Sequence, residues 1–136
     1  MLLRSTKKLS PILNGFYTYH NSIGDAYFKI NEYRRALGQY LLALNKTSSP
    51  DIFVKCGNCY KSLYTYDSSE YYYGVAKKIE PYKFSHQFAF LQLFEQKKDT
   101  VRILQKANEI IGMPIKIESQ KVDNIINYAK ALKSKL

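Results

Sequence analysis

The sequence is poor in glycine and proline and has no tryptophan: 6 Gly and 4 Pro occur among 136 residues. So few turn-forming residues argue against a β architecture with many tight turns and favour helices. No stretch approaches the ~18 consecutive apolar residues that a membrane-spanning helix needs. Arg4 follows the short apolar start of the chain, so no signal-peptide core is predicted either. We therefore expect a cytoplasmic protein, unless a larger parent protein ties it to a membrane.

The sequence is rich in tyrosine and in basic residues. It has 13 Tyr and 7 Phe, and 21 basic against 11 acidic residues give a formal charge of +10. Six basic residues lie near the two ends, and without them the balance is 15 to 11, or +4. Because more than half of the excess is terminal, the charge is a weak argument for nucleic-acid binding.

Four pairs of like residues recur at a spacing of 33. These pairs are Gly24 and Gly57, Tyr27 and Tyr60, Tyr40 and Tyr73, and Ala43 and Ala76. A fixed period of this size indicates stacked helical repeats, in which the small residues let helices approach closely and the aromatic residues fill the space between hairpins. The pattern resembles the tetratricopeptide repeat (TPR), a helix-turn-helix unit of roughly 34 residues.

This resemblance predicts an all-α fold, a TPR-like superhelical stack of antiparallel helix hairpins with a C-terminal capping helix. We expect one domain over residues 1–136, with repeats at about 17–49, 50–83 and 84–114 and a capping helix at about 119–135. The predicted helices are 16–30, 32–46, 51–64, 67–79, 83–96 and 99–112, followed by one from Ser119. The third repeat is degenerate, because Leu91 replaces the small residue. Leu9-Ser10-Pro11 is expected to end a preceding helix.

Four segments carry a narrower resemblance over residues 9–127. They are Ser48-Ser49-Pro50-Asp51, Gly57-Asn58-Cys59-Tyr60, Glu80-Pro81-Tyr82-Lys83-Phe84 and Gly112-Met113-Pro114-Ile115-Lys116-Ile117-Glu118-Ser119. Their order is similar to the C-terminal TPR tail of some bacterial O-antigen-ligase-family membrane proteins. In that family the chemistry belongs to a membrane portion that this chain lacks, so the resemblance implies an accessory region for surface-glycan assembly and no catalytic residue.

Cys56 and Cys59 form a C-x-x-C motif, the only candidate for redox or metal chemistry. A redox pair needs the first cysteine at a helix N-terminus, whereas both lie within a predicted helix. A zinc site needs four ligands, and His20 and His86 belong to other repeats. We interpret the cysteines as buried thiols and His20 as a packing residue, and we predict no metal, no cofactor and no enzymatic activity.

The function is expected on the concave surface that the first helices of the repeats form. Repeat alignment predicts a peptide-binding groove lined by Asn21, Asp25, Phe28, Lys29, Val54, Asn58, Lys61, Ser62, Phe88, Gln92 and Glu95. Asp25 stands where the carboxylate clamp of chaperone-binding TPR proteins has Asn, so a partner other than a chaperone's acidic C-terminus is expected. The leading hypothesis is a protein-interaction module for a peptide or helix. The alternatives are a basic solenoid that binds nucleic acid and a structural module that forms a homodimer through its N-terminal face.

Overall fold

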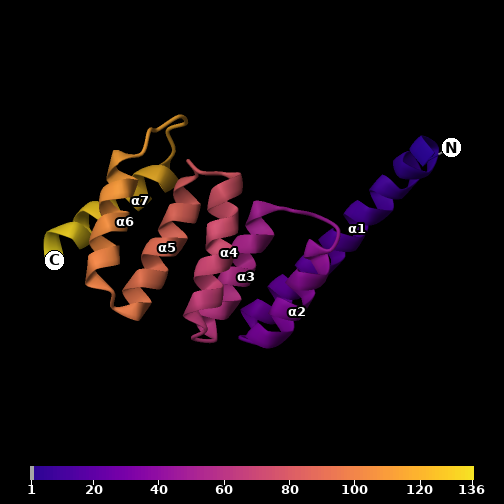
Figure 1. Ribbon diagram of the computed structural model, residues 1–136, viewed down its shortest axis with the longest axis horizontal. Coiled ribbons are helices and arrows are strands. Elements are labelled where there is room, and N and C mark those ends of the chain that lie inside the picture. The colour runs from indigo at the N-terminus through magenta and orange to yellow at the C-terminus, as the bar shows by residue number, and fades with distance from the viewer. Residues whose placement is uncertain (1) are drawn as a thin grey trace.

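The computed structural model describes the backbone of residues 2–136 and the side chains of residues 15–136, and this part of the chain is all helical (Figure 1). No strand occurs within these residues. The helices are α1 (Leu2–Lys29), α2 (Tyr33–Leu44), α3 (Pro50–Ser62), α4 (Tyr66–Ile79), α5 (Phe84–Lys97), α6 (Thr100–Gly112) and α7 (Gln120–Lys135). No helix of the described residues is long and apolar enough to cross a membrane.

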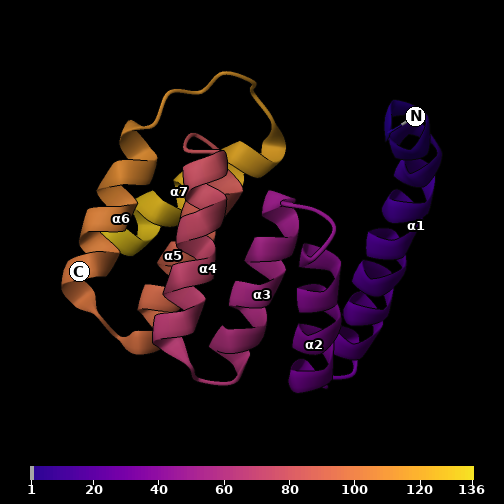
Figure 2. The same cartoon turned by 45° about the vertical axis from the view of Figure 1, so that its right-hand side comes forward.

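The first six helices form three antiparallel hairpins, which lie side by side in chain order (Figures 1 and 2). α7 packs against α6 and α5 at the C-terminal end of the row. One core cluster joins the first two hairpins, and a second joins α4, the third hairpin and α7 through Ile125 and Ala129. Each hairpin therefore buries its apolar face against its neighbours, as expected of stacked helical units.

Two glycines of the 33-residue period allow close contact between the helices of a hairpin. A Cβ built on Gly24 or Gly57 would lie well under 3.0 Å from the ring of Tyr40 or Tyr73, respectively. Both rings are almost completely buried. The glycine and the tyrosine are thus one packing unit, in which the ring fills the space that a side chain would take.

In the third hairpin, the positions that match the glycine and the tyrosine hold a large and a small side chain instead of a small and a large one. Leu91 lies 34 residues after Gly57, and Ala107 lies 34 residues after Tyr73; both are completely buried in one core cluster. A large residue on the first helix and a small one on the second replace the small and large pair. This exchange conserves volume in the way that packed cores tolerate best.

The turns inside the hairpins repeat at the same spacing. Asn31, Tyr64 and Lys98 have positive φ values of 63°, 59° and 58°. The N–H groups of the next residues donate to the carbonyls of Tyr27, Tyr60 and Phe94 at 2.9, 2.9 and 3.0 Å. This six-residue closure around a left-handed residue is a Schellman-type helix end, and it extends the repeat to the third hairpin.

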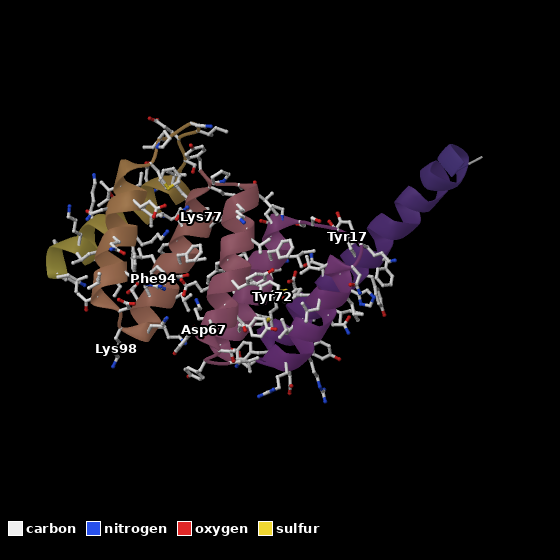
Figure 3. The ribbon with its side chains drawn as sticks, viewed as in Figure 1. Tyr17, Asp67, Tyr72, Lys77, Phe94 and Lys98 are labelled. Atoms are coloured by element: carbon white, nitrogen blue, oxygen red, sulfur yellow. The ribbon has the colours of Figure 1, made fainter. Side chains whose placement is uncertain are left out.

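Glycine at these left-handed positions should stabilise the chain. Lys98 lies at the tip of the turn between α5 and α6 (Figure 3). We expect Lys98→Gly to raise the free energy of unfolding by roughly 0.5–1 kcal/mol, because glycine adopts positive φ without steric cost. Urea denaturation followed by circular dichroism measures the change. The control Ala26→Gly, within α1 at an exposed site, should lower stability by about 1 kcal/mol, and a similar loss in Lys98→Gly would contradict the prediction.

Part of the tyrosine content forms an aromatic cluster on α3 and α4. The ring of Tyr72 stacks on Tyr60 and Phe53, with centroids 5.4 and 6.2 Å away, and lies between the two helices in Figure 3. Tyr71 contacts Tyr72 edge to face but is mostly exposed. These rings hold α3 and α4 together, so packing accounts for them.

The predicted helix end at Leu9-Ser10-Pro11 is wrong, because α1 continues through Pro11 without a break. Proline removes a single intrahelical hydrogen bond, and the Leu, Lys and Arg residues before it are good helix formers. The homodimer through the N-terminal face stays a prediction, and the side chains of residues 1–14, at this end of the chain, lie outside the described part. The other helix bounds agree with prediction to within a few residues.

Candidate functional site

A hollow of about 310 Å³ lies between α1 and α3, where the sequence predicts the groove. Its lining residues are Asp25, Phe28, Lys29, Tyr40, Lys55 and Asn58. Four of these six were predicted from the repeat alignment. Its walls are mostly apolar, with Phe28 and Tyr40 among the lining residues, and its polar groups belong to few residues, as is common in ligand sites.

A network of polar contacts joins α1, α2 and α3 at one side of this hollow. The Tyr40 hydroxyl donates to Asp25 Oδ1 at 2.6 Å, and Lys55 Nζ lies 3.0 Å from the same oxygen. Lys55 also donates to Asn21 Oδ1 at 2.9 Å. Burial, followed by the hydrogen bond to Asp25, raises the pKa of Tyr40, so the hydroxyl stays protonated and remains a donor. These contacts hold the first two hairpins in one relative position.

Asn58 is oriented by the second helix of its own hairpin. The Tyr73 hydroxyl donates to Asn58 Oδ1, and burial raises the pKa of Tyr73. The Asn58 Nδ2 group has no acceptor among the described residues, although Asn58 lines the hollow. The amide therefore presents two N–H donors at the surface in a fixed orientation.

A second hollow of about 290 Å³ continues from the first. It is lined by Asp51, Val54, Lys55, Asn58, Ser85, His86 and Lys121. Lys55 and Asn58 belong to both hollows, so together the hollows form one surface from α1 across α3 to the N-terminal ends of α5 and α7. We call these two hollows the inner groove.

His86 is the most buried polar residue of the inner groove, with 2% of its surface exposed. Its Nε2 atom lies 2.9 Å from Glu80 Oε1, whereas Nδ1 is buried and lacks a partner among the described residues. The other histidine, His20, lies 2.6 Å from Gln39 through Nδ1 and packs edge to face on Phe16. His20 is thus the packing residue that the sequence predicts.

Two of the three predicted lining residues of the third repeat, Phe88 and Glu95, contact α7. The ring of Phe88 meets Tyr128 edge to face at 5.3 Å, and Glu95 accepts the Tyr128 hydroxyl at 2.7 and 2.8 Å. This hydrogen bond, helped by burial, raises the pKa of Tyr128 to about 12. Gln92 is exposed. Phe88 and Glu95 therefore connect α5 to α7. Phe88 also lines a further hollow of about 450 Å³, which shares Lys121 with the second hollow of the inner groove.

Lys61 and Ser62 also lie outside the inner groove, at the C-terminal end of α3. Burial lowers the pKa of Lys61, and the nearby Glu95 carboxylate opposes that shift. The Lys61 carbonyl accepts a hydrogen bond from Gln96 at 3.0 Å. Of the predicted residues on α3, Val54 and Asn58 are the two that line the inner groove.

Sequence reasoning missed several residues of the inner groove. Tyr40 was assigned to the core alone, yet its hydroxyl reaches Asp25 and it is among the residues that line the first hollow. Lys55 lies one position after the predicted Val54, and its bonds to α1 depend on how the hairpins pack. Ser85, His86 and Lys121 come from helix starts that the repeat alignment does not bring together. No local pattern in the sequence would have found them.

The C-x-x-C residues are buried thiols, as predicted. Cys56 and Cys59 are free and completely buried. Burial raises the pKa of each to about 12, so both stay protonated at neutral pH and are poor nucleophiles. No group of three or more metal-binding side chains occurs in the described part of the chain.

No model of a known protein family matches this chain, and no characterised protein matches its sequence. The function must therefore be inferred from the inner groove itself.

Proposed function

We propose that this chain is a TPR-like interaction module that binds an extended peptide or a helix of another protein in the inner groove. The observation that carries the proposal is the continuity of the two hollows through Lys55 and Asn58, whose side chains are already oriented by α1 and α4. Groups that are ordered before binding lose little conformational entropy on binding.

The repeating geometry supports a TPR-like arrangement. The Gly24–Tyr40 and Gly57–Tyr73 contacts and the three left-handed turns recur every 33 or 34 residues. A catalytic role has no comparable support, since the two thiols are held neutral and buried. The proposed link to surface-glycan assembly and the proposed cytoplasmic location rest on the sequence alone.

Asn58→Asp tests the proposal with little change of shape. Aspartate keeps the oxygen that accepts from Tyr73 but replaces the two free N–H donors by a second carboxylate oxygen. Peptides that bind the wild type would be selected from a displayed random library and their affinities measured by fluorescence anisotropy. We expect Asn58→Asp to bind them at least about tenfold more weakly, a loss of about 1.4 kcal/mol.

The matched control is Asn108→Asp, the same chemical change at an exposed site of α6. It should leave peptide affinity unchanged. Selection of no peptide, or equal binding by both variants, would refute the proposal. Binding of a single-stranded RNA oligonucleotide that falls steeply with salt and ignores Asn58→Asp would instead support the basic solenoid.

A further inference from the structure

The carboxylates next to the inner groove already have partners. Asp25 pairs with Lys55 at 3.0 Å, and Asp51 lies 3.6 Å from Lys83 Nζ. Glu95, just outside the groove, accepts the Tyr128 hydroxyl. Lys83 also lies 3.6 Å from Glu80, so it is shared by two carboxylates. Of the acidic side chains, Asp25 and Asp51 line the hollows themselves.

Two lysines of the inner groove lack such partners. Lys29 lines the first hollow and Lys121 the second, both are exposed, and neither has an ion-pair or hydrogen-bond partner among the described residues. They lie on α1 and α7, with Lys55 and Asn58 shared between the hollows. The lining of the two hollows has three lysines (Lys29, Lys55 and Lys121) and two aspartates (Asp25 and Asp51), a net charge of +1. One unpaired lysine lies in each hollow, which complements an acidic ligand.

The first hollow suits one large apolar side chain. Its walls are mostly apolar, with Phe28 and Tyr40 among the lining residues. Lys55 Nζ lies 5.8 Å from the Tyr40 ring centre and bonds to Asp25 and Asn21. The Lys55 stem is thereby left as an apolar wall. A buried aromatic or aliphatic anchor contributes most of the binding energy in many interfaces, and this hollow has the chemistry to hold one.

We propose that the inner groove takes an acidic peptide segment with one Phe, Leu or similar side chain in the first hollow and side-chain carboxylates toward Lys29 and Lys121. A peptide carbonyl would accept from Asn58 Nδ2. The inference rests on the proposed function and adds the class of partner. A nucleic acid fits less well, because its phosphates would meet only two unpaired lysines and have no use for the apolar hollow. The acidic groups are side chains, so no chain terminus is required.

The composition of the selected peptides is the first test. Peptides that bind the wild type should be enriched in Asp and Glu and should carry a single large apolar residue. Selection of neutral or basic peptides would overturn this inference while the proposed function stands. Selection of no peptide at all would refute both.

Charge reversal at the two unpaired lysines is the second test. The probe is a fluorescein-labelled acidic octapeptide with one central Phe. The double variant Lys29→Glu/Lys121→Glu should bind it at least about tenfold more weakly than the wild type, since each lysine loses an attractive contact and gains a repulsive one. The affinity should also fall by about tenfold when the peptide's Phe becomes Ser.

The matched control is Lys78→Glu/Lys98→Glu, which makes the same change of net charge at exposed sites outside the groove. It should weaken binding by no more than about twofold, because surface charges beyond the Debye length of about 8 Å are screened at physiological salt. Equal weakening by the two pairs would overturn the inference. So would displacement of the octapeptide by a single-stranded RNA oligonucleotide with a steep salt dependence, which would assign the groove to nucleic acid.

Discussion

Gly57→Ala is expected to lower the free energy of unfolding by about 3 kcal/mol, a large part of the total for a chain of this size. The added Cβ would lie well under 3.0 Å from the Tyr73 ring. The ring cannot withdraw easily, because it is completely buried, packs on Phe90 and donates its hydroxyl to Asn58. Chemical denaturation followed by circular dichroism measures the loss.

The control for this prediction is Gly38→Ala on α2. No heavy atom lies within 4 Å of a Cβ built at this exposed helical position. We expect a gain of roughly 0.5–1 kcal/mol, because alanine restricts the unfolded chain and favours the helix. The same substitution should thus have opposite effects at the two glycines. Unchanged stability in Gly57→Ala would show that the close contact with Tyr73 is unimportant.

The third hairpin suggests a compensating change. Gly57→Leu alone should unfold the second hairpin, since leucine needs more room than alanine at the same contact. Adding Tyr73→Ala reproduces the Leu91 and Ala107 pair, and we expect the double variant to recover several kcal/mol of the loss. A loss of stability in the double variant equal to the sum of the losses in the two single variants would contradict the idea that the pair is one packing unit.

The two buried thiols should also make stability fall steeply above about pH 9, which is the pKa of an unperturbed thiol. Burial raises the pKa of Cys56 and of Cys59 from 9.0 to about 12. Between these values the unfolded chain loses the thiol protons and the folded chain keeps them. The stabilisation is therefore complete below pH 9.0 and is lost as pH rises toward about 12. Each thiol contributes a slope of about −1.4 kcal/mol per pH unit.

Cys56→Ala/Cys59→Ala isolates this effect. The double variant should be less stable at neutral pH by about 1–2 kcal/mol through lost packing, but its stability should decline less steeply between about pH 9 and 10. The raised pKa values of Tyr40 and Tyr73 add a decline above pH 10.0 in both proteins. Urea unfolding under reducing conditions over a series of pH values gives the two slopes. Parallel curves would show that the thiols do not control alkaline unfolding.

The helices and their pairing could be predicted because their signals are local. The 33-residue period predicts close packing of helices at Gly24 and at Gly57. In the structure, the Tyr40 ring packs against Gly24 and the Tyr73 ring packs against Gly57. The predicted helix end near Pro11 was wrong, because α1 continues through this residue. Proline often ends a helix, yet it costs a helix only one hydrogen bond and some distortion. A proline alone does not say whether the helix continues beyond it.

The candidate site was predicted only in part. Repeat alignment found Asp25, Phe28, Lys29 and Asn58, because one face of a helix recurs at fixed positions. It also predicted Phe88 and Glu95, which contact Tyr128 of α7. An alignment within repeats does not specify which surface a helix after the last repeat covers.

The sequence by itself determined the helical class, the order of hairpins and the burial of the two cysteines, because apolar period and residue size act between neighbours on one helix or within one hairpin. Only the tertiary structure decided that Lys55 reaches from α3 to Asn21 and Asp25 on α1, and that Lys121, Ser85 and His86 line one hollow beside α3. These residues are up to about 100 positions apart in the chain. Their meeting depends on the angles at which whole helices pack, and those angles follow from the shapes of many side chains together.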